Sequence, residues 1–430
     1  MKRRVEKALE NWKGKGTLRK PLLLNGARQV GKTYILRNFG EQFFRNMVYV
    51  NLETNRSAAA IFDENISPER IVRLLEAESG TRVIPEETLL ILDEIQSCER
   101  ALTSLKYFCE EAPQYYVAAA GSLLGVAVNR EKFSFPVGMV DILRMYPLDF
   151  EEFLLAHGYE SLAGEIRLHA ESLESLSEGL HEKAMELYRE YLLVGGMPSA
   201  VKNFLREGSF LEASEVHRGI LDSYVADMAK YASAAESVKI RSCYGSIPAQ
   251  LAKENKKFQY KVVKNGGSAS YFGASIEWLE YSGAVLKCTR LEHAYDPIEA
   301  YVDLSGFKLY MGDVGLLATM SGISRQAVFG NSESKFVGAL AENYVAQQLA
   351  SRGETLHYWE SQGRAELDFV LQNDSEIKGI EVKSGTNVHS RSHSIFCGKY
   401  PHTKPIRISL RNFGTDGKLV TLPLYAAHCL

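Results

Sequence analysis

Short apolar runs alternate with helix-length segments over the first third of the chain. The runs lie at residues 21–24, 47–52, 89–92 and 115–120. Continuous apolar runs of about four to eight residues are typical of parallel strands that are buried on both faces. Strands separated by helices indicate βαβ units. We therefore expect residues 1–155 to form an α/β domain around a parallel sheet.

The pattern changes after this first domain. Residues 156–235 carry Leu, Glu, Ala and Tyr at helical spacing, with one break at Gly195-Gly196-Met197-Pro198. Residues 236–305 predict a small mixed α/β unit, and residues 306–430 predict a helix followed by several strands. A chain of 430 residues is long enough for two to four domains, so four parts are a reasonable division.

A glycine-rich loop follows the first apolar run and precedes a helical segment. Its residues are Gly26, Ala27, Arg28, Gln29, Val30, Gly31, Lys32 and Thr33. The spacing GxxxxGK[ST] between a strand and a helix predicts a phosphate-binding loop, because backbone N–H groups and the helix N-terminus can surround phosphate oxygens. We expect Lys32 to bind the β- and γ-phosphates and Thr33 to bind Mg²⁺. The predicted cofactors are ATP and Mg²⁺.

Two acidic residues follow the third apolar run. Asp93 and Glu94 come directly after residues 89–92, which is a Walker B pattern. Asp93 is the candidate ligand of the Mg²⁺ shell, and Glu94 is the candidate base for the attacking water. The next run ends near Ser122, which is a candidate sensor of the γ-phosphate; the alternative is an ordinary turn serine.

These motifs, together with three further segments, resemble a known family. The segments are Tyr146-Pro147-Leu148-Asp149-Phe150-Glu151-Glu152-Phe153, Tyr191-Leu192-Leu193-Val194-Gly195-Gly196-Met197-Pro198 and Glu381-Val382-Lys383. The chain is similar over nearly its whole length to predicted prokaryotic AAA+ ATPases with an "AAA domain 14" and a conserved C-terminal region of unknown function. The resemblance implies an α/β fold with four parts: an AAA+ P-loop core (1–155), a helical lid (156–235), a winged-helix-like module (236–305) and a PD-(D/E)xK nuclease-like domain (306–430).

One position departs from that family. Relatives commonly carry a basic residue after the glycine that corresponds to Gly138, whereas this chain has Met139. Arg130 and Arg144 lie nearby, but neither matches by position. Loss of an arginine finger costs about 10³–10⁵ in rate. We therefore expect hydrolysis to be slow or to need a partner.

The middle module has the order of a winged helix-turn-helix. We expect one helix to start at Ser246-Ile247-Pro248, a second to run from Ser268 to Tyr281, and a strand to follow at residues 284–288. The second helix carries two glutamates and no basic residue, so it is a poor reader of DNA bases. Five lysines precede it: Lys253, Lys256, Lys257, Lys261 and Lys264. DNA phosphate contact and a role in protein packing both stay open.

A carboxylate and lysine set lies near the C-terminus. Glu342 lies in a helical segment, Asp368 in a predicted strand at 366–370, and Glu381 and Lys383 on one face of another strand. This set fits the D…ExK pattern of nuclease-like folds, in which carboxylates bind Mg²⁺ and the lysine positions water. The alternative is a salt-bridged pair of half-buried strands.

Composition and charge bear on where the protein is found and on its partners, but they do not choose between its possible functions. The formal net charge is −3, so the chain as a whole does not favour nucleic acid. The six cysteines form no CxxC pair, and no apolar segment matches a signal peptide or a membrane span, so we expect a cytoplasmic protein. DNA, another protein and a second copy of the chain are the candidate partners. Three functions remain: an ATP-hydrolysing switch or motor, an ATP-regulated metal-dependent DNA nuclease, and a non-catalytic ATP-binding interaction protein.

Overall fold

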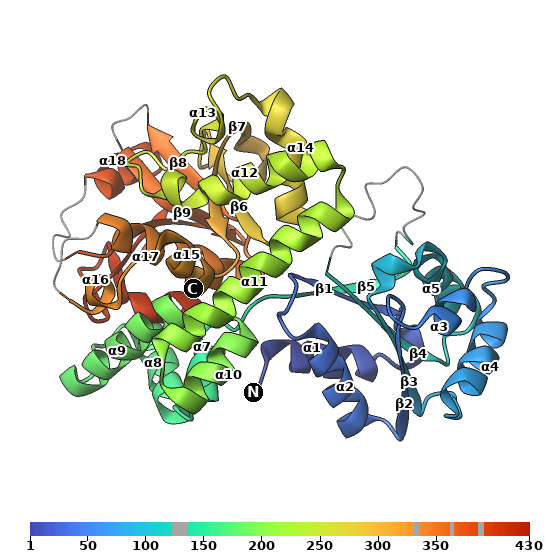
Figure 1. Cartoon of the computed structure of the whole chain (residues 1–430). Helices are drawn as coiled ribbons and strands as arrows, with labels where there is room; N and C mark the ends of the chain where they lie inside the picture. The colour runs from blue at the N-terminus through green and yellow to red at the C-terminus, as the bar shows by residue number, and fades with distance from the viewer. Residues whose placement is uncertain (123–135, 137, 331–334, 362–364, 386–390) are drawn as a thin grey trace. The chain divides into compact units, whose positions relative to one another are not determined.

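The computed structural model describes residues 1–122, 136, 138–330, 335–361, 365–385 and 391–430. The chain forms two compact units, which we call the N-terminal unit and the C-terminal unit (Figure 1). The N-terminal unit comprises Lys2–Tyr146 with Tyr281–Gly283, and the C-terminal unit comprises Pro147–Glu280 and Ala284–Leu430 with Met1. No helix in the described ranges has the length and apolar character needed to cross a membrane.

A parallel sheet is the centre of the N-terminal unit. Its strands are β1 (Leu22–Gly26), β2 (Asn46–Asn51), β3 (Thr88–Asp93), β4 (Tyr116–Gly121) and β5 (Asp141–Met145). The strand order is β2-β3-β4-β1-β5, and every neighbouring pair is parallel. The four apolar runs fall on β1 to β4, so the predicted α/β fold with a parallel sheet is confirmed. The carboxyl ends of β1, β3 and β4 meet at one edge, where ligands bind in open α/β sheets.

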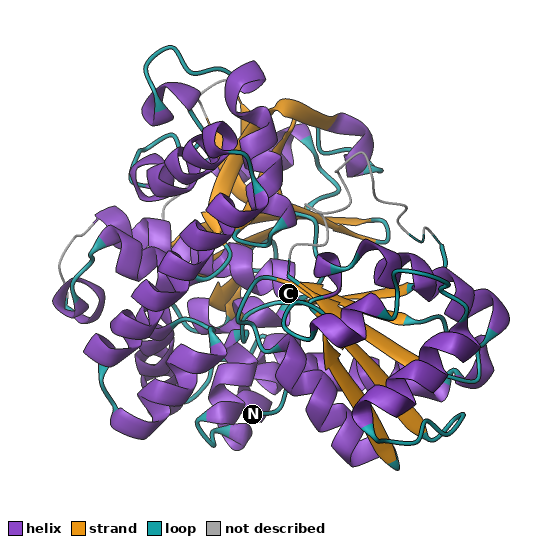
Figure 2. Cartoon of the chain, turned by 45° about the vertical axis from the view of Figure 1, so that its right-hand side comes forward, coloured by secondary structure: helices purple, strands orange, loops and turns teal. Residues whose placement is uncertain are grey.

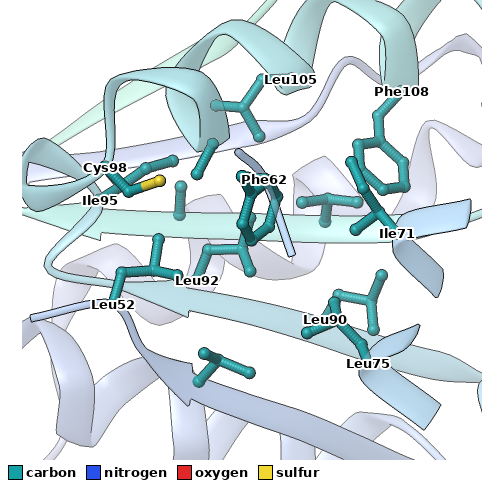
Figure 3. Packing of buried hydrophobic residues seen from close by; sticks show 14 of the residues in the cluster. Leu52, Phe62, Ile71, Leu75, Leu90, Leu92, Ile95, Cys98, Leu105 and Phe108 are labelled. Carbon is teal, nitrogen blue, oxygen red and sulfur yellow. The ribbon is translucent and has the colours of Figure 1, made fainter. Parts of the chain in front are cut away.

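Helices cover this sheet and seal its core. They are α1 (Arg4–Gly14), α2 (Lys32–Phe43), α3 (Arg56–Ala60), α4 (Pro68–Ser79) and α5 (Glu99–Glu111). Figure 3 shows Leu90 and Leu92 of β3 packed with Phe62 and with Leu105 and Phe108 of α5. These side chains are almost fully buried, and burial of this kind contributes about 1.5–3 kcal/mol per residue. The packed core holds the strand ends, and hence the site, in place.

The first half of the C-terminal unit is helical, as the spacing predicts (Figure 2). Its helices are α7 (Phe150–Ala156), α8 (Glu160–Ser172), α9 (Glu178–Val194), α10 (Pro198–Glu207) and α11 (Phe210–Tyr231). The break between α9 and α10 lies in close contact with the Asp313 side chain and the Leu148 backbone. A Cβ on Gly195 would lie 2.2 Å from Asp313 Oδ1, and one on Gly196 would lie 2.0 Å from the Leu148 carbonyl oxygen. Only glycine fits at these two positions.

Three helices follow: α12 (Ala234–Leu251), α13 (Tyr260–Val263) and α14 (Ala269–Tyr281). The expected helix start at Ser246-Ile247-Pro248 is wrong, because Pro248 lies in the last turn of α12. The helix starts instead at Ser233, whose side chain forms a capping box with Glu236. The pattern Ser-x-x-Glu was present in the sequence and is the stronger start signal. The expected second helix, from Ser268 to Tyr281, agrees with α14.

A mixed sheet forms the rest of the C-terminal unit. Its strands are β6 (Val285–Leu291), β7 (Val302–Met311), β8 (His357–Ser361), β9 (Ala365–Asn373), β10 (Glu376–Lys383), β11 (Lys404–Ser409), β12 (Gly414–Thr415) and β13 (Val420–Pro423). Their order is β12-β13-β11-β10-β9-β8-β6-β7. The antiparallel pair β6–β7 therefore continues the sheet through a parallel pairing of β6 with β8. The expected division between residues 305 and 306 lies inside β7.

Four more helices accompany this sheet, and one of them carries a predicted site residue. They are α15 (Val314–Ser321), α16 (Arg325–Phe329), α17 (Lys335–Ser351) and α18 (Ser392–Lys399). Helix α17 includes the segment in which helical spacing was expected, and Glu342 on it is buried.

Candidate active site at the phosphate loop

The glycine-rich loop connects β1 to α2 in the N-terminal unit. Gly26 lies so close to β5 that a Cβ would be 2.2 Å from the Met145 carbonyl oxygen. Gly31 has a φ of 97° and precedes the first residue of α2, while Gln29 has a φ of 65°. Left-handed backbone at two positions turns the loop around a central space, as a phosphate-binding loop requires.

Lys32 is the first residue of α2, and its side chain folds back over the loop. Its Nζ donates hydrogen bonds of 2.8 Å to the carbonyl oxygens of Gly26 and Ala27. The side chain is 7% exposed. An ammonium group held by neutral carbonyls at the centre of the loop is placed where phosphate oxygens would bind in a loop of this type.

Asp93 brings the two Walker motifs together. Its Oδ2 accepts a hydrogen bond of 2.8 Å from the Thr33 hydroxyl and another of 2.8 Å from the Tyr49 hydroxyl. Burial and the hydrogen bond to Asp93 raise the pKa of Tyr49 to about 12, so this phenol remains a donor. A hydroxyl and a carboxylate oxygen at this separation are the hard oxygen ligands that Mg²⁺ prefers. The donor set at this point therefore fits a magnesium ion.

Glu94 directly follows Asp93 in the chain, and a hydrogen bond from Gln96 holds its carboxylate. Its φ of 52° is left-handed, which is uncommon for a residue other than glycine. The Gln96 amide donates a hydrogen bond to Glu94 Oε2. Burial raises the pKa of Glu94, and the Gln96 hydrogen bond opposes that rise. A half-desolvated carboxylate beside the phosphate loop has the character of a general base.

The remaining predicted residues of this site are less closely grouped. Ser122 is buried directly after β4, whose Gly121 lies beside Asn25 of β1. Met139 is half-buried next to Gly138, whereas Arg144 is exposed and stacks on the Tyr146 ring at 5.3 Å. Arg130 lies outside the described residues.

The strand-loop-helix geometry and the Thr33–Asp93 contact define a P-loop nucleotide-binding domain. A family model described as an AAA domain matches residues 18–154. Models of two domains of unknown function, DUF8612 and DUF4143, match residues 185–327 and 337–425. Residues 18–154 thus form an AAA domain that is followed by two domains of unknown function, and this confirms the resemblance that the sequence predicted.

The chain is also similar to several solved structures. The Walker-type ATPase of Pyrococcus abyssi is 15% identical with a TM-score of 0.44, and the match covers 73% of this chain and 94% of that chain. The Aeropyrum pernix ORC2 protein is 12% identical with a TM-score of 0.37, covering 80% and 93%. The Thermotoga maritima RuvB branch migration motor is 13% identical with a TM-score of 0.30, covering 68% and 89%. Comparison with curated proteins finds no match.

The C-terminal carboxylates surround a buried lysine that the sequence analysis did not single out. Lys308 of β7 is 1% exposed, and its Nζ lies 3.0 Å from Glu342 Oε1, 2.5 Å from Glu366 Oε1 and 3.8 Å from Asp368 Oδ1. Lys256 and the Tyr310 hydroxyl also donate to Glu342. We call this group the Lys308 cluster.

Charges within the Lys308 cluster compensate one another. Burial disfavours the charged forms, but Lys256 and Lys308 outweigh it and hold the pKa of Glu342 well below its usual range. Burial and the nearby Glu342 raise the pKa of Asp368 to about 7. Burial opposes the ammonium form of Lys308, yet the carboxylates raise its pKa well above the ordinary value.

The other two predicted nuclease-type residues pair with each other. Lys383 Nζ lies 3.0 Å from Glu381 Oε1, and the backbone N–H of Val382 donates to Asp368 Oδ2 at 2.7 Å. The structure thus brings Asp368 and Glu381 to neighbouring strands, and the Lys308 Nζ lies 3.0 Å from Glu342 and 3.8 Å from Asp368. Within the described ranges, no group of three or more His, Cys, Asp or Glu side chains is arranged to hold a metal ion.

Sequence reasoning missed four residues that hold these sites. Arg3 donates to the carbonyl oxygens of Val30 and Tyr146, at 3.1 and 2.7 Å, and so anchors the phosphate loop. Tyr49 and Gln96 orient Asp93 and Glu94. Gln96 is near enough to Glu94 in sequence to be suspected, but Arg3 and Tyr49 depend on contacts between distant segments. Lys308 had a signal, namely a single charge within the apolar strand Phe307–Met311.

Proposed function

We propose that the protein binds and hydrolyses ATP at the phosphate loop. The observation that carries the proposal is the 2.8 Å contact between the Thr33 hydroxyl and Asp93. It joins the loop of β1 to the end of β3, so the phosphate and magnesium ligands belong to one site. The match of residues 18–154 to an AAA domain supports the same chemistry.

The residues divide the reaction among themselves. Lys32 exchanges its two carbonyl partners for β- and γ-phosphate oxygens, and Thr33 with Asp93 would hold Mg²⁺, which neutralises charge on the phosphates. Glu94 accepts a proton from the water that attacks the γ-phosphorus, and the bond to the β,γ-bridging oxygen breaks to give ADP and phosphate. Ser122 senses the γ-phosphate from the end of β4.

We propose a slow switch or motor rather than a fast hydrolase. Met139 stands where relatives commonly carry a basic residue, and such a residue contributes about 10³–10⁵ in rate. A basic group supplied by a partner protein or a second copy would complete the site. In this proposal, the nucleotide state is passed to a helical lid (156–235) and onward to a DNA or protein partner.

A matched set of variants tests ATP binding and turnover separately. Lys32→Ala should lose nucleotide binding in a calorimetric titration with Mg²⁺-ATP. Glu94→Gln should bind ATP with little change but lose most phosphate release, because only the base is removed. Lys106→Ala, an exposed change on α5, should resemble the wild type. Unchanged nucleotide affinity in Lys32→Ala would sink the proposal.

The third function, a protein that binds ATP without turning it over, competes with this one. It rests on Met139 and predicts no phosphate release above that of Glu94→Gln. Phosphate release by the wild type, measured alone and with DNA, separates the two. Phosphate release above that of Glu94→Gln under either condition dismisses the non-catalytic alternative, and none under either condition favours it.

We propose that residues 236–305 are a winged-helix-like module and residues 306–430 a nuclease-like domain that does not cleave DNA. The order α12-α13-α14-β6-β7 supports the first assignment. The neighbouring Asp368 and Glu381 support the second, while the Lys308 ammonium lies among the carboxylates that a divalent ion would need. The competing function is an ATP-regulated metal-dependent nuclease.

Cleavage assays decide between these two interpretations of the C-terminal domain. The full chain is incubated with duplex and single-stranded DNA and Mg²⁺ or Mn²⁺, with and without ATP. We expect no cleavage by the wild type. Cleavage that Glu381→Ala abolishes would overturn our assignment, whereas cleavage that persists in this variant would come from a contaminating nuclease.

A further inference from the structure

The segment that carries α12 and α13 is basic, although the chain as a whole is acidic. Residues 236–267 contain seven Lys or Arg against two Glu, a formal excess of five positive charges, whereas the whole chain has a net charge of −3. A concentration of positive charge in an otherwise acidic protein marks the electrostatic footprint of a polyanionic partner.

Two of these lysines flank one exposed aromatic ring. Tyr271 is 45% exposed in the first turn of α14. The Nζ atoms of Lys239, from α12, and Lys264, from the end of α13, lie 3.9 and 5.5 Å from its ring centroid. Three separate segments therefore place two ammonium groups around one tyrosine. We call Lys239, Lys264 and Tyr271, together with the exposed Lys261, the basic surface.

Within the part of the chain that the structure describes, no carboxylate neutralises the lysines of this surface. None of Lys239, Lys261 and Lys264 forms an ion pair with a carboxylate of the described residues. Glu236, three residues before Lys239, caps the start of α12 through Ser233. Glu277 lies six residues after Tyr271, about 9 Å further along α14. By contrast, Lys256 from the same segment is bound to Glu342.

Aromatic packing joins the elements that carry this surface. Tyr260 of α13 stacks on Phe272 of α14 with ring centroids 6.4 Å apart, and Phe258 stacks on Phe307 of β7 at 5.4 Å. A Cβ on Gly267 would lie 2.7 Å from the Tyr260 carbonyl oxygen, so the turn before α14 is tightly fitted. The cations are thus displayed on a rigid support, which lowers the cost of ordering them on binding.

Polar donors complete the chemistry of the surface. The hydroxyls of Ser268 and Ser270 lie 2.9 Å apart at the start of α14, next to Tyr271, and both residues are exposed. Lysine ammonium groups, serine hydroxyls and a tyrosine are the groups that contact phosphate and sugar in nucleic-acid complexes. An exposed aromatic ring among cations also suits base or sugar contact.

We propose that the basic surface binds the phosphodiester backbone of a nucleic acid without reading its sequence. The inference rests on the proposed function, in which the ATPase passes its nucleotide state to a partner, and it names that partner's class. The absence of Lys and Arg on α14 itself explains why the contact is to the backbone rather than to base edges.

The test measures binding of the full chain to fluorescent nucleic acids of equal length by anisotropy, over a range of salt concentrations. Separate arms use duplex DNA, single-stranded DNA and RNA, which distinguish the sources of the shared phosphodiester chemistry. Lys239→Gln with Lys264→Gln removes two phosphate contacts, so the slope of log affinity against log salt should fall by about two. Between about 50 and 200 mM salt, the wild type should then lose about tenfold more affinity than the double variant.

Two control variants separate loss of nucleic-acid binding from misfolding and from loss of ATP binding. Lys202→Gln, an exposed change on α10, should retain the wild-type slope. Lys32→Ala should bind nucleic acid as the wild type does in the absence of nucleotide, so failure of the ATPase proposal would not imitate failure of this one. An unchanged salt slope in the double variant overturns the proposal, as does binding to acidic phospholipid vesicles but to no nucleic acid.

Discussion

Replacing Lys308 by methionine removes the positive charge at the centre of the Lys308 cluster while keeping most of the side-chain volume. In the wild type, the ammonium lies 3.0 Å from Glu342 and 2.5 Å from Glu366, and it also stands over the Tyr358 ring at 4.9 Å. The side chain is 1% exposed, so water cannot replace these contacts. Removing one partner of a buried ion pair costs about 3–5 kcal/mol, because the other charges stay buried.

Urea unfolding of the full chain measures this cost. Trp359 of β8 is fully buried and reports the C-terminal unit by fluorescence. With a slope of about 2–3 kcal/mol per molar urea, a loss of about 4 kcal/mol lowers the midpoint by roughly 1.5–2 M. Lys287→Met is the matched control. Lys287 lies on the neighbouring strand, is more exposed and is 3.8 Å from Glu280, so its loss should cost at most about 1 kcal/mol.

The pH dependence of this difference follows from Glu342. Its folded pKa is depressed, so its stabilising contribution is present above its unfolded pKa of about 4.3 and is lost as pH falls through the folded value. The deficit of Lys308→Met should therefore be largest above about pH 7, begin to shrink as Asp368, whose pKa is raised to about 7, gains a proton, and shrink further below about pH 4. A midpoint shift no larger than that of Lys287→Met, or one that grows at acid pH, would refute this account of the cluster.

Three further outcomes follow from the geometry. Gln96→Leu should lower kcat for ATP about ten- to hundredfold with KM nearly unchanged, because Glu94 loses the donor that orients it; steady-state kinetics decide. Tyr49→Phe should weaken the Mg²⁺ dependence of ATP binding about tenfold, as a hydrogen bond to a charged group is worth about 1.5–3 kcal/mol, and an unchanged Mg²⁺ titration would contradict it. Gly195→Ala should cost about 3 kcal/mol in urea unfolding, whereas Gly208→Ala, with a similar φ but open space, should cost only about 1.

Local patterns predicted the elements whose signal lies within their own residues. The four apolar runs identified β1 to β4, because strands buried on both faces are continuously apolar. The segment around Pro248 failed because proline was taken as a start signal, while the capping box at Ser233 decided where α12 begins. The strand expected at residues 284–288 agrees with β6, but its place beside β8 was not predicted, since that pairing joins residues far apart in the chain.

In the candidate sites too, contacts between distant segments could not be predicted from the sequence. Lys32, Thr33, Asp93 and Glu94 were accessible because phosphate binding demands fixed spacing within one loop and one strand end. The residues that orient them come from elsewhere: Arg3 reaches the loop from the N-terminus, and the hydroxyl of Tyr49 joins Asp93 across neighbouring strands. No spacing rule connects such residues, because the contact exists only after the sheet has formed.

The buried side chains of Lys32 and Lys308 differ in whether phosphate oxygens can replace their present partners. This difference bears on which of the two lysines can bind a phosphate. Lys32 is held by two neutral carbonyl oxygens, so phosphate oxygens that carry full negative charge are better partners and can displace them. Lys308 is held by carboxylates, and an arriving phosphate would have to approach the buried charges of Glu342 and Glu366 without offering a stronger partner. Exchange is therefore favourable at the phosphate loop and unfavourable in the C-terminal unit. The neutral partners of Lys32 thus suit the nucleotide binding that we propose for it, whereas the carboxylate partners of Lys308 suit a structural role.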